Sequence, residues 1–231
     1  MSKKATKTEK GEQTKAAILN AALETFHEHG YEKTTMREIA KRAGLSLGSA
    51  YYYFRSKEHL IQAFYHLTHE QHLAALAAEP VAPNFKVGLR TLLRLKISTL
   101  APYHEFAGSL FKTAANPKSP LNPFGPDSDP LRTKSIGVFR DLVESSKVRI
   151  PKDLREELPA LLWLYQMGVI LFWIHDSSRK QVRTYRLIER TVDMLDGLIS
   201  VASNPLMRPV RKRALGLIEE LREAAKETLG D

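Results

Sequence analysis

The segment from Thr34 to Phe54 constrains the fold of this chain more than any other part of the sequence. Two short helical patterns flank Gly44, at a position where the backbone needs a positive φ that glycine adopts without steric cost. Ala40 and Ala50 supply small side chains at the points where the two helices must cross closely. The segment therefore predicts two short helices joined by a tight turn.

Capping residues mark where each of these helices begins. Thr35 followed by Glu38 predicts a capping box, and Ser46 is suited to cap the second helix. Paired short helices around a glycine turn are typical of a helix-turn-helix, in which the second helix enters the major groove of DNA. The segment thus indicates a DNA-binding module.

The helical period decides which side chains of the second helix face outward. Ala50 faces inward, and the opposite face then carries Leu47, Gly48, Tyr51 and Tyr52. A rotation of about 60° is the alternative, and it would bury Leu47 and Tyr51 and expose Ser49 and Tyr53. Exposed tyrosines beside small residues suit phosphate oxygens and thymine methyl groups.

A longer series of residues surrounds this segment. It comprises Thr14, Ile18, Leu19, Ala21, Ala22, Phe26, Gly30 and Tyr31, then Thr34-Thr35, Ile39-Ala40, Ala43-Gly44-Leu45-Ser46, Gly48, Tyr51-Tyr52-Tyr53-Phe54, Lys57 and Leu60. Over roughly residues 12–70 this series resembles the N-terminal domain of TetR-family transcriptional regulators. The resemblance implies an all-α, two-domain homodimer that binds a palindromic double-stranded DNA operator. Its C-terminal domain would dimerise and usually bind a small effector.

The resemblance also assigns DNA contacts residue by residue. Thr35 and Lys57 would touch phosphates, and Leu47 would lie against base edges. The family often has a polar residue at this last position, whereas leucine offers only apolar contacts, so Arg37 and DNA shape would carry more of the specificity. The expected DNA-binding residues are Thr35, Arg37, Ser46, Leu47, Gly48, Ser49, Tyr51, Tyr52, Tyr53 and Lys57.

The sequence suggests three regions. We expect a flexible basic tail over 1–11, a three-helix helix-turn-helix domain over 12–58, and a larger helical regulatory and dimerisation domain over 59–231. The tail is either a solubilising segment or a minor-groove arm that uses Lys3, Lys4, Lys7 and Lys10. Helices are expected over 13–29, 56–78, 85–100, 102–115, 130–146, 152–175, 179–202 and 205–229.

Five prolines exclude a helix from residues 116–130. This long surface loop is either a connector or a lid over a pocket.

Spacing predicts a dimer interface near the C-terminus. Apolar residues recur at intervals of three and four in the helix after Arg179, and Gly168 would allow a close helix crossing. The alternative is an intramolecular core. The expected interface residues are Gly168, Tyr185, Ile188, Val192, Leu195 and Ile199.

An effector pocket is predicted from aromatic and polar residues on the middle helices. The candidates are Phe64, His69, His72, Tyr103, Phe106, Phe111, Phe139, Trp163, Gln166 and Met167. Because most of them are apolar, we expect a mostly hydrophobic effector.

Other functional classes lack their sequence signals. The chain has no cysteine, which excludes disulfides and thiol chemistry and fits a cytoplasmic protein. No phosphate-binding loop, nucleophile elbow or paired carboxylates indicate an enzyme, and no cofactor is expected. A metal site would have only His66 with Glu70, so none is assigned.

The apolar run over 160–174 is too short for a membrane span. A net charge of +9 favours a polyanionic partner, although the excess is spread along the chain.

Two functional hypotheses follow. The first is a homodimeric repressor that a small, mostly hydrophobic effector releases from its operator. The alternative is a constitutive dimeric DNA-binding protein without an effector pocket.

Overall fold

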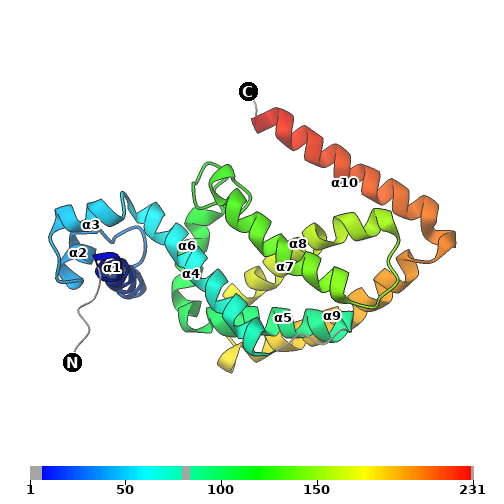
Figure 1. Cartoon of the computed structure of the whole chain (residues 1–231), viewed down its shortest axis with the longest axis horizontal. Coiled ribbons are helices and arrows are strands. Elements are labelled where there is room, and N and C mark those ends of the chain that lie inside the picture. Colours follow the sequence, from blue (N-terminus) through cyan, green and yellow to red (C-terminus); the bar gives the residue numbers. More distant parts are fainter. Residues whose placement is uncertain (1–6, 80–83, 230–231) are drawn as a thin grey trace. The chain divides into compact units, whose positions relative to one another are not determined.

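The chain forms helices joined by short turns and loops. The computed structural model describes residues 7–79 and 84–229, and this part contains no strand. Figure 1 shows the helices, and the chain divides into two compact units. The N-terminal unit comprises residues 1–74 and 99–133, and the C-terminal unit comprises residues 75–98 and 134–231. The all-α class predicted from the sequence is confirmed.

The helix-turn-helix lies in the N-terminal unit. Gly30 and Gly44 take positive φ angles of 79° and 69°, and each follows the end of a helix. This unit contains α1 (Lys7–His29), α2 (Met36–Arg42), α3 (Leu47–Tyr53), residues 57–74 of α4 (Lys57–Ala78), η1 (Ala101–Tyr103), α6 (His104–Ala114), η2 (Pro126–Ser128) and the first turn of α7 (Asp129–Ser145). Gly44 therefore ends α2 as the sequence predicted, and Gly30 ends α1 in the same way.

One apolar core joins these helices. Ile18, Ile39, Leu60 and Ile61 have no exposed surface, and Ala50 packs against them from α3. They come from four successive helices, α1 to α4, so the three-helix module is packed onto the start of α4. The structure thus has the close helix crossing that the small residues predicted.

The C-terminal unit is a second helical assembly. Its α8 and α9 are joined by a hydrogen bond between the hydroxyls of Tyr165 and Thr191, and Arg211 of α10 pairs with Asp153 of α8 at 3.0 Å. The unit contains residues 75–78 of α4, residues 85–98 of α5 (Phe85–Leu100), most of α7, α8 (Lys152–Ile174), η3 (Arg179–Gln181), α9 (Val182–Ala202), η4 (Pro205–Met207) and α10 (Arg208–Leu229).

Helix α8 is long and apolar enough to cross a membrane by length and composition alone. However, Leu162, Val169 and Trp173 are buried inside the C-terminal unit, and Tyr165 is bonded to α9. This helix therefore supplies part of the core of its unit. At 23 residues it is longer than the apolar run over 160–174 that we judged too short for a membrane span.

Two boundaries differ from those expected. Helix α1 begins at Lys7, so residues 7–11, which we expected in a flexible tail, are helical, and Lys3 and Lys4 lie outside the described residues. Helix α6 and the proline-rich loop belong to the N-terminal unit, whereas we expected everything after residue 58 in a separate domain. Local sequence patterns mark helices but do not show which helices pack together.

The proline-rich loop is anchored to the N-terminal unit. Leu121 is completely buried in the core of that unit, and Gln62 of α4 donates a 2.8 Å hydrogen bond to the carbonyl of Pro120. The segment is therefore packed against α4 in this structure.

Candidate nucleic-acid interface

Local hydrogen bonds fix the start of each helix of the helix-turn-helix. The Thr35 hydroxyl accepts from the Glu38 N–H at 3.3 Å, and the Thr35 N–H donates to the Glu38 carboxylate at 2.7 Å. These backbone and hydroxyl bonds lower the pKa of Glu38. Ser46 accepts from the Ser49 N–H at 3.1 Å. The predicted capping box and the predicted cap at Ser46 are both confirmed.

The outer face of α3 carries aromatic rings. Tyr52 is 82% exposed and Tyr51 47% exposed, and Gly48 is also open to solvent. Ala50 is fully buried on the opposite face. The first of the two predicted orientations is therefore the one found, with one change, because Leu47 is half-buried and packs against the core.

The other residues expected to contact DNA lie around this face. Ser49 and Tyr53 are half-buried, and the ring of Tyr53 supports that of Tyr52 edge-on, with 5.1 Å between centroids. Thr35, Arg37 and Ser46 are exposed. The face thus combines two exposed phenol rings with short polar side chains, a set suited to phosphate and base-edge contacts.

Lys57 is held by the protein itself. Its ammonium donates to the carbonyls of Tyr31 at 2.8 Å and Glu32 at 3.3 Å, and lies 4.6 Å from the centre of the Tyr31 ring. Tyr31 in turn donates to the Glu58 carboxylate at 2.9 Å. We expected Lys57 to bind a phosphate. In the folded chain it ties the start of α4 to the loop that follows α1, and nothing in the local sequence signals these partners. The phosphate contact stays a prediction.

An ion-paired arginine fixes α2 on α1. Arg42 binds the Glu28 carboxylate through both terminal nitrogens and lies 3.6 Å from Glu24. The hydrogen bond from Arg42 lowers the pKa of Glu28. This contact restricts the position of the helix-turn-helix on α1.

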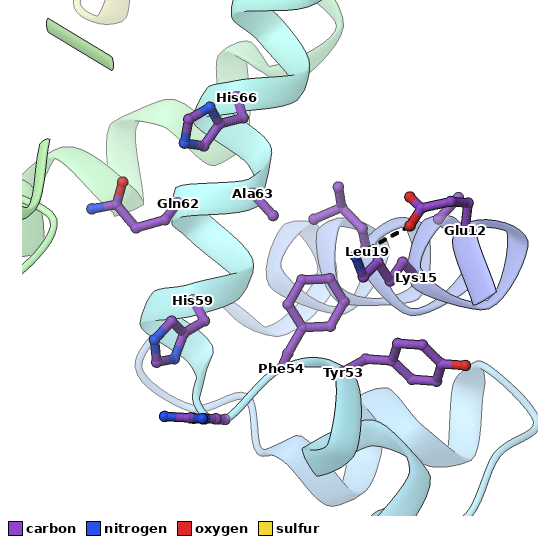
Figure 2. A pocket seen from close by; sticks show the side chains of 11 residues that line it. Glu12, Lys15, Leu19, Tyr53, Phe54, His59, Gln62, Ala63 and His66 are labelled. Atoms are coloured by element: carbon purple, nitrogen blue, oxygen red, sulfur yellow. Dashed lines mark hydrogen bonds and ion pairs between the residues drawn. The ribbon is translucent and has the colours of Figure 1, made fainter. Parts of the chain in front are cut away.

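A cleft of about 540 Å³ opens between α1, the end of α3 and α4. Figure 2 shows Phe54 pointing between Leu19 of α1 and the helix α4, which carries His59 and His66. The cleft is lined by Glu12, Lys15, Ala16, Leu19, Tyr53, Phe54, Arg55, His59, Gln62, Ala63 and His66. Arg55 was not among the predicted site residues, although it directly follows the aromatic run.

Helix α6 is packed into the same unit as the helix-turn-helix. The Phe106 ring stacks on Phe26 of α1 and meets Phe64 of α4 edge-on, with centroids 5.5 and 5.7 Å away. Polar contacts support this packing, since Thr113 donates to Glu32 at 2.8 Å. Sequence periodicity could not reveal this connection.

The ten candidate pocket residues do not gather in one unit. Phe64, Tyr103 and Phe106 form an aromatic cluster inside the N-terminal unit, where His69 and His72 are also buried and Phe111 is half-buried. The C-terminal unit holds Phe139, Trp163, Gln166 and Met167. The cleft of Figure 2 is lined by none of the ten. Aromatic content predicted buried positions but did not separate core residues from pocket residues.

The predicted dimer seam lies mostly inside the C-terminal unit. Ile188 and Val192 have no exposed surface, Ile199 is almost as buried, and Tyr185 lies under the Arg94 guanidinium of α5. Ile188 and Val192 therefore cannot contact a second copy of the folded chain, which corrects the expectation for them. Leu195 is half-buried, and Gly168 is exposed on α8 as an interface would require.

A different apolar surface is exposed on the same two helices. It consists of Leu164, Gly168, Leu171 and Phe172 on α8 with Met194, Gly197, Leu198 and Val201 on α9, and we call it the α8–α9 face. The spacing of three or four residues within each helix puts each set on one side.

Comparisons with known proteins agree with this architecture. Residues 18–64 match the model of bacterial regulatory proteins of the tetR family, and residues 89–215 match that of the tetracyclin repressor-like C-terminal domain. The chain is 38% identical over 64 residues to the HTH-type transcriptional regulator TtgR of Pseudomonas putida, covering 28% of this chain and 30% of that protein. It is 43% identical over 68 residues to UidR of Escherichia coli, covering 29% of this chain and 34% of that protein.

These sequence matches span only about a third of either relative. Similarity in fold extends much further. One similar structure is that of the transcriptional regulator FadR from Bacillus subtilis in complex with stearoyl-CoA. Its TM-score is 0.60 at 17% sequence identity, and the match covers 77% of this chain and 96% of that one. Because the C-terminal model alone spans more than half of the sequence, this chain belongs to the TetR family of transcriptional regulators, which are not enzymes.

Proposed function

We propose that this protein is a cytoplasmic, homodimeric repressor that binds a palindromic operator and leaves it when a small, mostly hydrophobic effector binds. Within this proposal the DNA-binding domain is the helix-turn-helix module, and the remaining helices regulate and dimerise. The observation that carries it is the exposed Tyr51 and Tyr52 pair on α3, held by a fully buried Ala50 on the opposite side.

The proposed DNA contacts come from the first turns of α2 and α3 and from the outer face of α3. Thr35, Arg37 and Ser46 would contact the backbone, and Tyr51 and Tyr52 would reach phosphates or base edges. Gly48 lets the helix approach the groove closely, with Ser49 and Tyr53 at the side. We assign Leu47 only a partial apolar contact because it is half-buried, and Lys57 a positioning role.

The α8–α9 face is the surface that we propose for dimerisation. Its exposed apolar side chains include Leu164 and Met194, which are 51% and 65% exposed. Apolar surface of this extent in a helix pair is typical of an interaction site. Gly168 and Gly197 leave room for close crossing of helices from a second copy. Such a four-helix contact would hold two recognition helices at the separation of successive major grooves, about 34 Å.

Coupling to an effector would run through α6. Because α6 shares an aromatic cluster with α1 and α4, a displacement of Phe106 cannot occur without repacking against Phe26 and Phe64. An effector that shifts α6 would thereby move the helix-turn-helix. The FadR relative in fold was solved with stearoyl-CoA, an effector-sized molecule with a long apolar part.

Selection of genomic DNA fragments by the purified protein tests the DNA-binding proposal. The wild type should enrich fragments that share an inverted repeat, and Tyr52→Ala should lose that enrichment while keeping wild-type thermal stability. Leu206→Ala, which truncates another exposed side chain, is the matched control and should enrich the same fragments. Enrichment by Tyr52→Ala equal to that of the wild type would contradict the proposed face.

The constitutive alternative makes a different prediction about regulation. A regulator without an effector would stay bound to its operator DNA in the presence of every apolar or anionic compound that binds the protein. Release of labelled operator DNA by such a compound favours the repressor.

A further inference from the structure

Helix α10 exposes a row of apolar side chains. Val210 and Leu217 are 56% and 55% exposed, and Ala214 between them is exposed as well. Leu206, which lies in η4 four residues before Val210, is 86% exposed. Counted at 100° per residue, the three residues of α10 lie within about 60° of one another. Together the four form one stripe, which we call the α10 face.

Arg211 holds α10 on α8 and shows which side of the helix is used there. Its guanidinium pairs with Asp153 of α8 at 3.0 Å and donates to the carbonyl of Ala202 at 2.6 Å. Because Arg211 directly follows Val210, it lies about 100° away from it around the helix. The contact with α8 therefore uses another side of α10 and leaves the α10 face exposed.

Two opposite charges border the α10 face on the same flank. Arg213 and Glu220 lie about 40° and 60° from Leu217 by the same count, and both are exposed. Neither side chain has an ion-pair or hydrogen-bond partner in the part of the chain that the structure describes. Seven residues, or about 10 Å of helix, separate them, which is too far for them to pair with each other.

The charges of α10 are distributed unequally along its length. Residues 208–213 contain four cations and no acid, whereas residues 219–223 contain three glutamates and one arginine. A helix that lies on a membrane surface is typically rich in cations along its whole polar side, and the acidic second half of α10 does not fit this pattern. A second α10 in the antiparallel direction would instead place a basic half against an acidic half.

We propose that the α10 face binds the α10 face of a second copy, with the two helices antiparallel about a two-fold axis close to Leu217. This axis brings Arg213 of each copy opposite Glu220 of the other, so one contact forms twice. The last two turns of the partner's helix would lie against Leu206 and Val210. A parallel pair would place arginine against arginine and glutamate against glutamate, which disfavours it.

This contact is separate from the α8–α9 face and goes beyond the proposed function, because it joins two dimers into a tetramer. Four side chains from each copy make a small interface, and small interfaces are weak and transient. The tetramer should therefore form at micromolar or higher concentrations and dissociate at the nanomolar concentrations used with labelled DNA.

Sedimentation of the full-length protein without DNA, at concentrations up to about 300 μM, detects association of this strength. The wild type should pass from dimers to tetramers as its concentration rises. Arg213→Glu and Glu220→Arg should each weaken this step about tenfold or more, since each replaces two ion pairs with two repulsive pairs. The double variant Arg213→Glu/Glu220→Arg, and an equimolar mixture of the two single variants, should restore it.

Lys212→Glu and Glu219→Arg are the matched controls. Both residues are exposed, and both lie on the side of α10 opposite Val210, so these variants should assemble as the wild type does. Equal weakening by the controls would show a general effect of charge and overturn the proposal. Wild-type assembly in Arg213→Glu and Glu220→Arg would also overturn it. So would binding of the wild type to phosphatidylserine vesicles without any tetramer, which would assign the α10 face to a lipid surface.

Met194→Glu, on the α8–α9 face, separates this inference from the proposed dimer. At high concentration this variant should still form pairs through α10, and adding Arg213→Glu should leave it monomeric. A wild type that stays dimeric at every concentration would refute the α10 contact and leave the α8–α9 dimer standing. A wild type whose only association is lost in Arg213→Glu and unchanged in Met194→Glu would support the α10 contact and refute the α8–α9 dimer.

Discussion

The ring of Phe106 in α6 lies nearly parallel to the ring of Phe26 in α1, with 7° between their planes and 5.5 Å between their centroids. Both side chains are almost fully buried. This pair fixes a helix from the middle of the chain onto the first helix of the DNA-binding module, and Phe64 of α4 closes the same cluster.

Truncation of the stacked ring should destabilise the protein. Phe106→Ala removes a buried aromatic side chain and leaves a cavity, which should cost about 3 to 5 kcal/mol of unfolding free energy. Urea denaturation followed by circular dichroism measures the loss. Phe124→Ala, at a 53% exposed position of the same unit, is the control and should lose much less. Equal losses in the two variants would show that the stacked pair contributes little.

The exposed tyrosine of α3 should affect DNA binding without affecting stability. Tyr52→Ala leaves the core intact, so its unfolding free energy should stay within ~0.5 kcal/mol of the wild type. Its affinity for the operator should fall about tenfold, or ~1.4 kcal/mol. Anisotropy titrations at several salt concentrations measure this change. Unchanged affinity at every concentration of salt would remove Tyr52 from the interface.

Asp176 should stabilise the junction of α8 and α9 in a pH-dependent manner. Burial alone would raise the pKa of this carboxylate, but hydrogen bonds from the hydroxyls and backbone N–H groups of Ser178 and Thr184 lower it to about 2. The unfolded chain therefore binds a proton more readily than the folded chain, so this contribution is complete above about pH 4 and is lost as pH falls toward 2.

Removing the charge of Asp176 should reproduce the acid effect at neutral pH. Asp176→Asn should cost about 2 kcal/mol at pH 7, and the gap from the wild type should narrow as the solution is acidified. Denaturation of both proteins across this pH range measures the gap. A constant difference at every pH would show that the carboxylate charge does not matter.

Lys96 of α5 should make stability rise with pH in the alkaline range, the same direction as for Asp176 in acid. Because its pKa is about 8 in the folded chain, the unfolded chain binds more protons between pH 8 and about 10.4, the usual pKa of lysine. Stability should therefore rise with pH across this window, by at most ~3 kcal/mol. Lys96→Met should be more stable than the wild type at pH 7, and the two should converge by pH 10. A parallel pH dependence in both proteins would contradict the burial of the ammonium.

Much of the helix-turn-helix could be predicted because its signals are local. Gly44 needs a positive φ, and Thr35 finds its capping partner Glu38 within one turn. Helix boundaries elsewhere also followed from periodicity and proline. The contacts of Lys57 could not be predicted, because its partners Tyr31 and Glu32 come from a loop 25 or more residues away.

The dimer surface shows a second limit of sequence patterns. The regular apolar spacing through Ile188 and Val192 predicted a helix face that is buried, and this is what the structure contains. Spacing does not say whether the surface that buries it belongs to the same chain. The apolar residues left exposed, such as Leu198, lie beside the predicted seam. They could be identified only from the structure, in which α5 packs against α9.

Two copies joined through the α8–α9 face should bind one operator, and the Met194→Glu variant is the test of this arrangement. Sedimentation with a labelled inverted repeat should show two wild-type chains on each DNA, whereas Met194→Glu should be monomeric and bind at least tenfold more weakly, a loss of about 1.4 kcal/mol or more. Arg186→Glu, a change at an exposed polar position of α9, should remain dimeric. A wild type that binds as a single chain, or a Met194→Glu variant that still binds in pairs with unchanged affinity, would contradict the account.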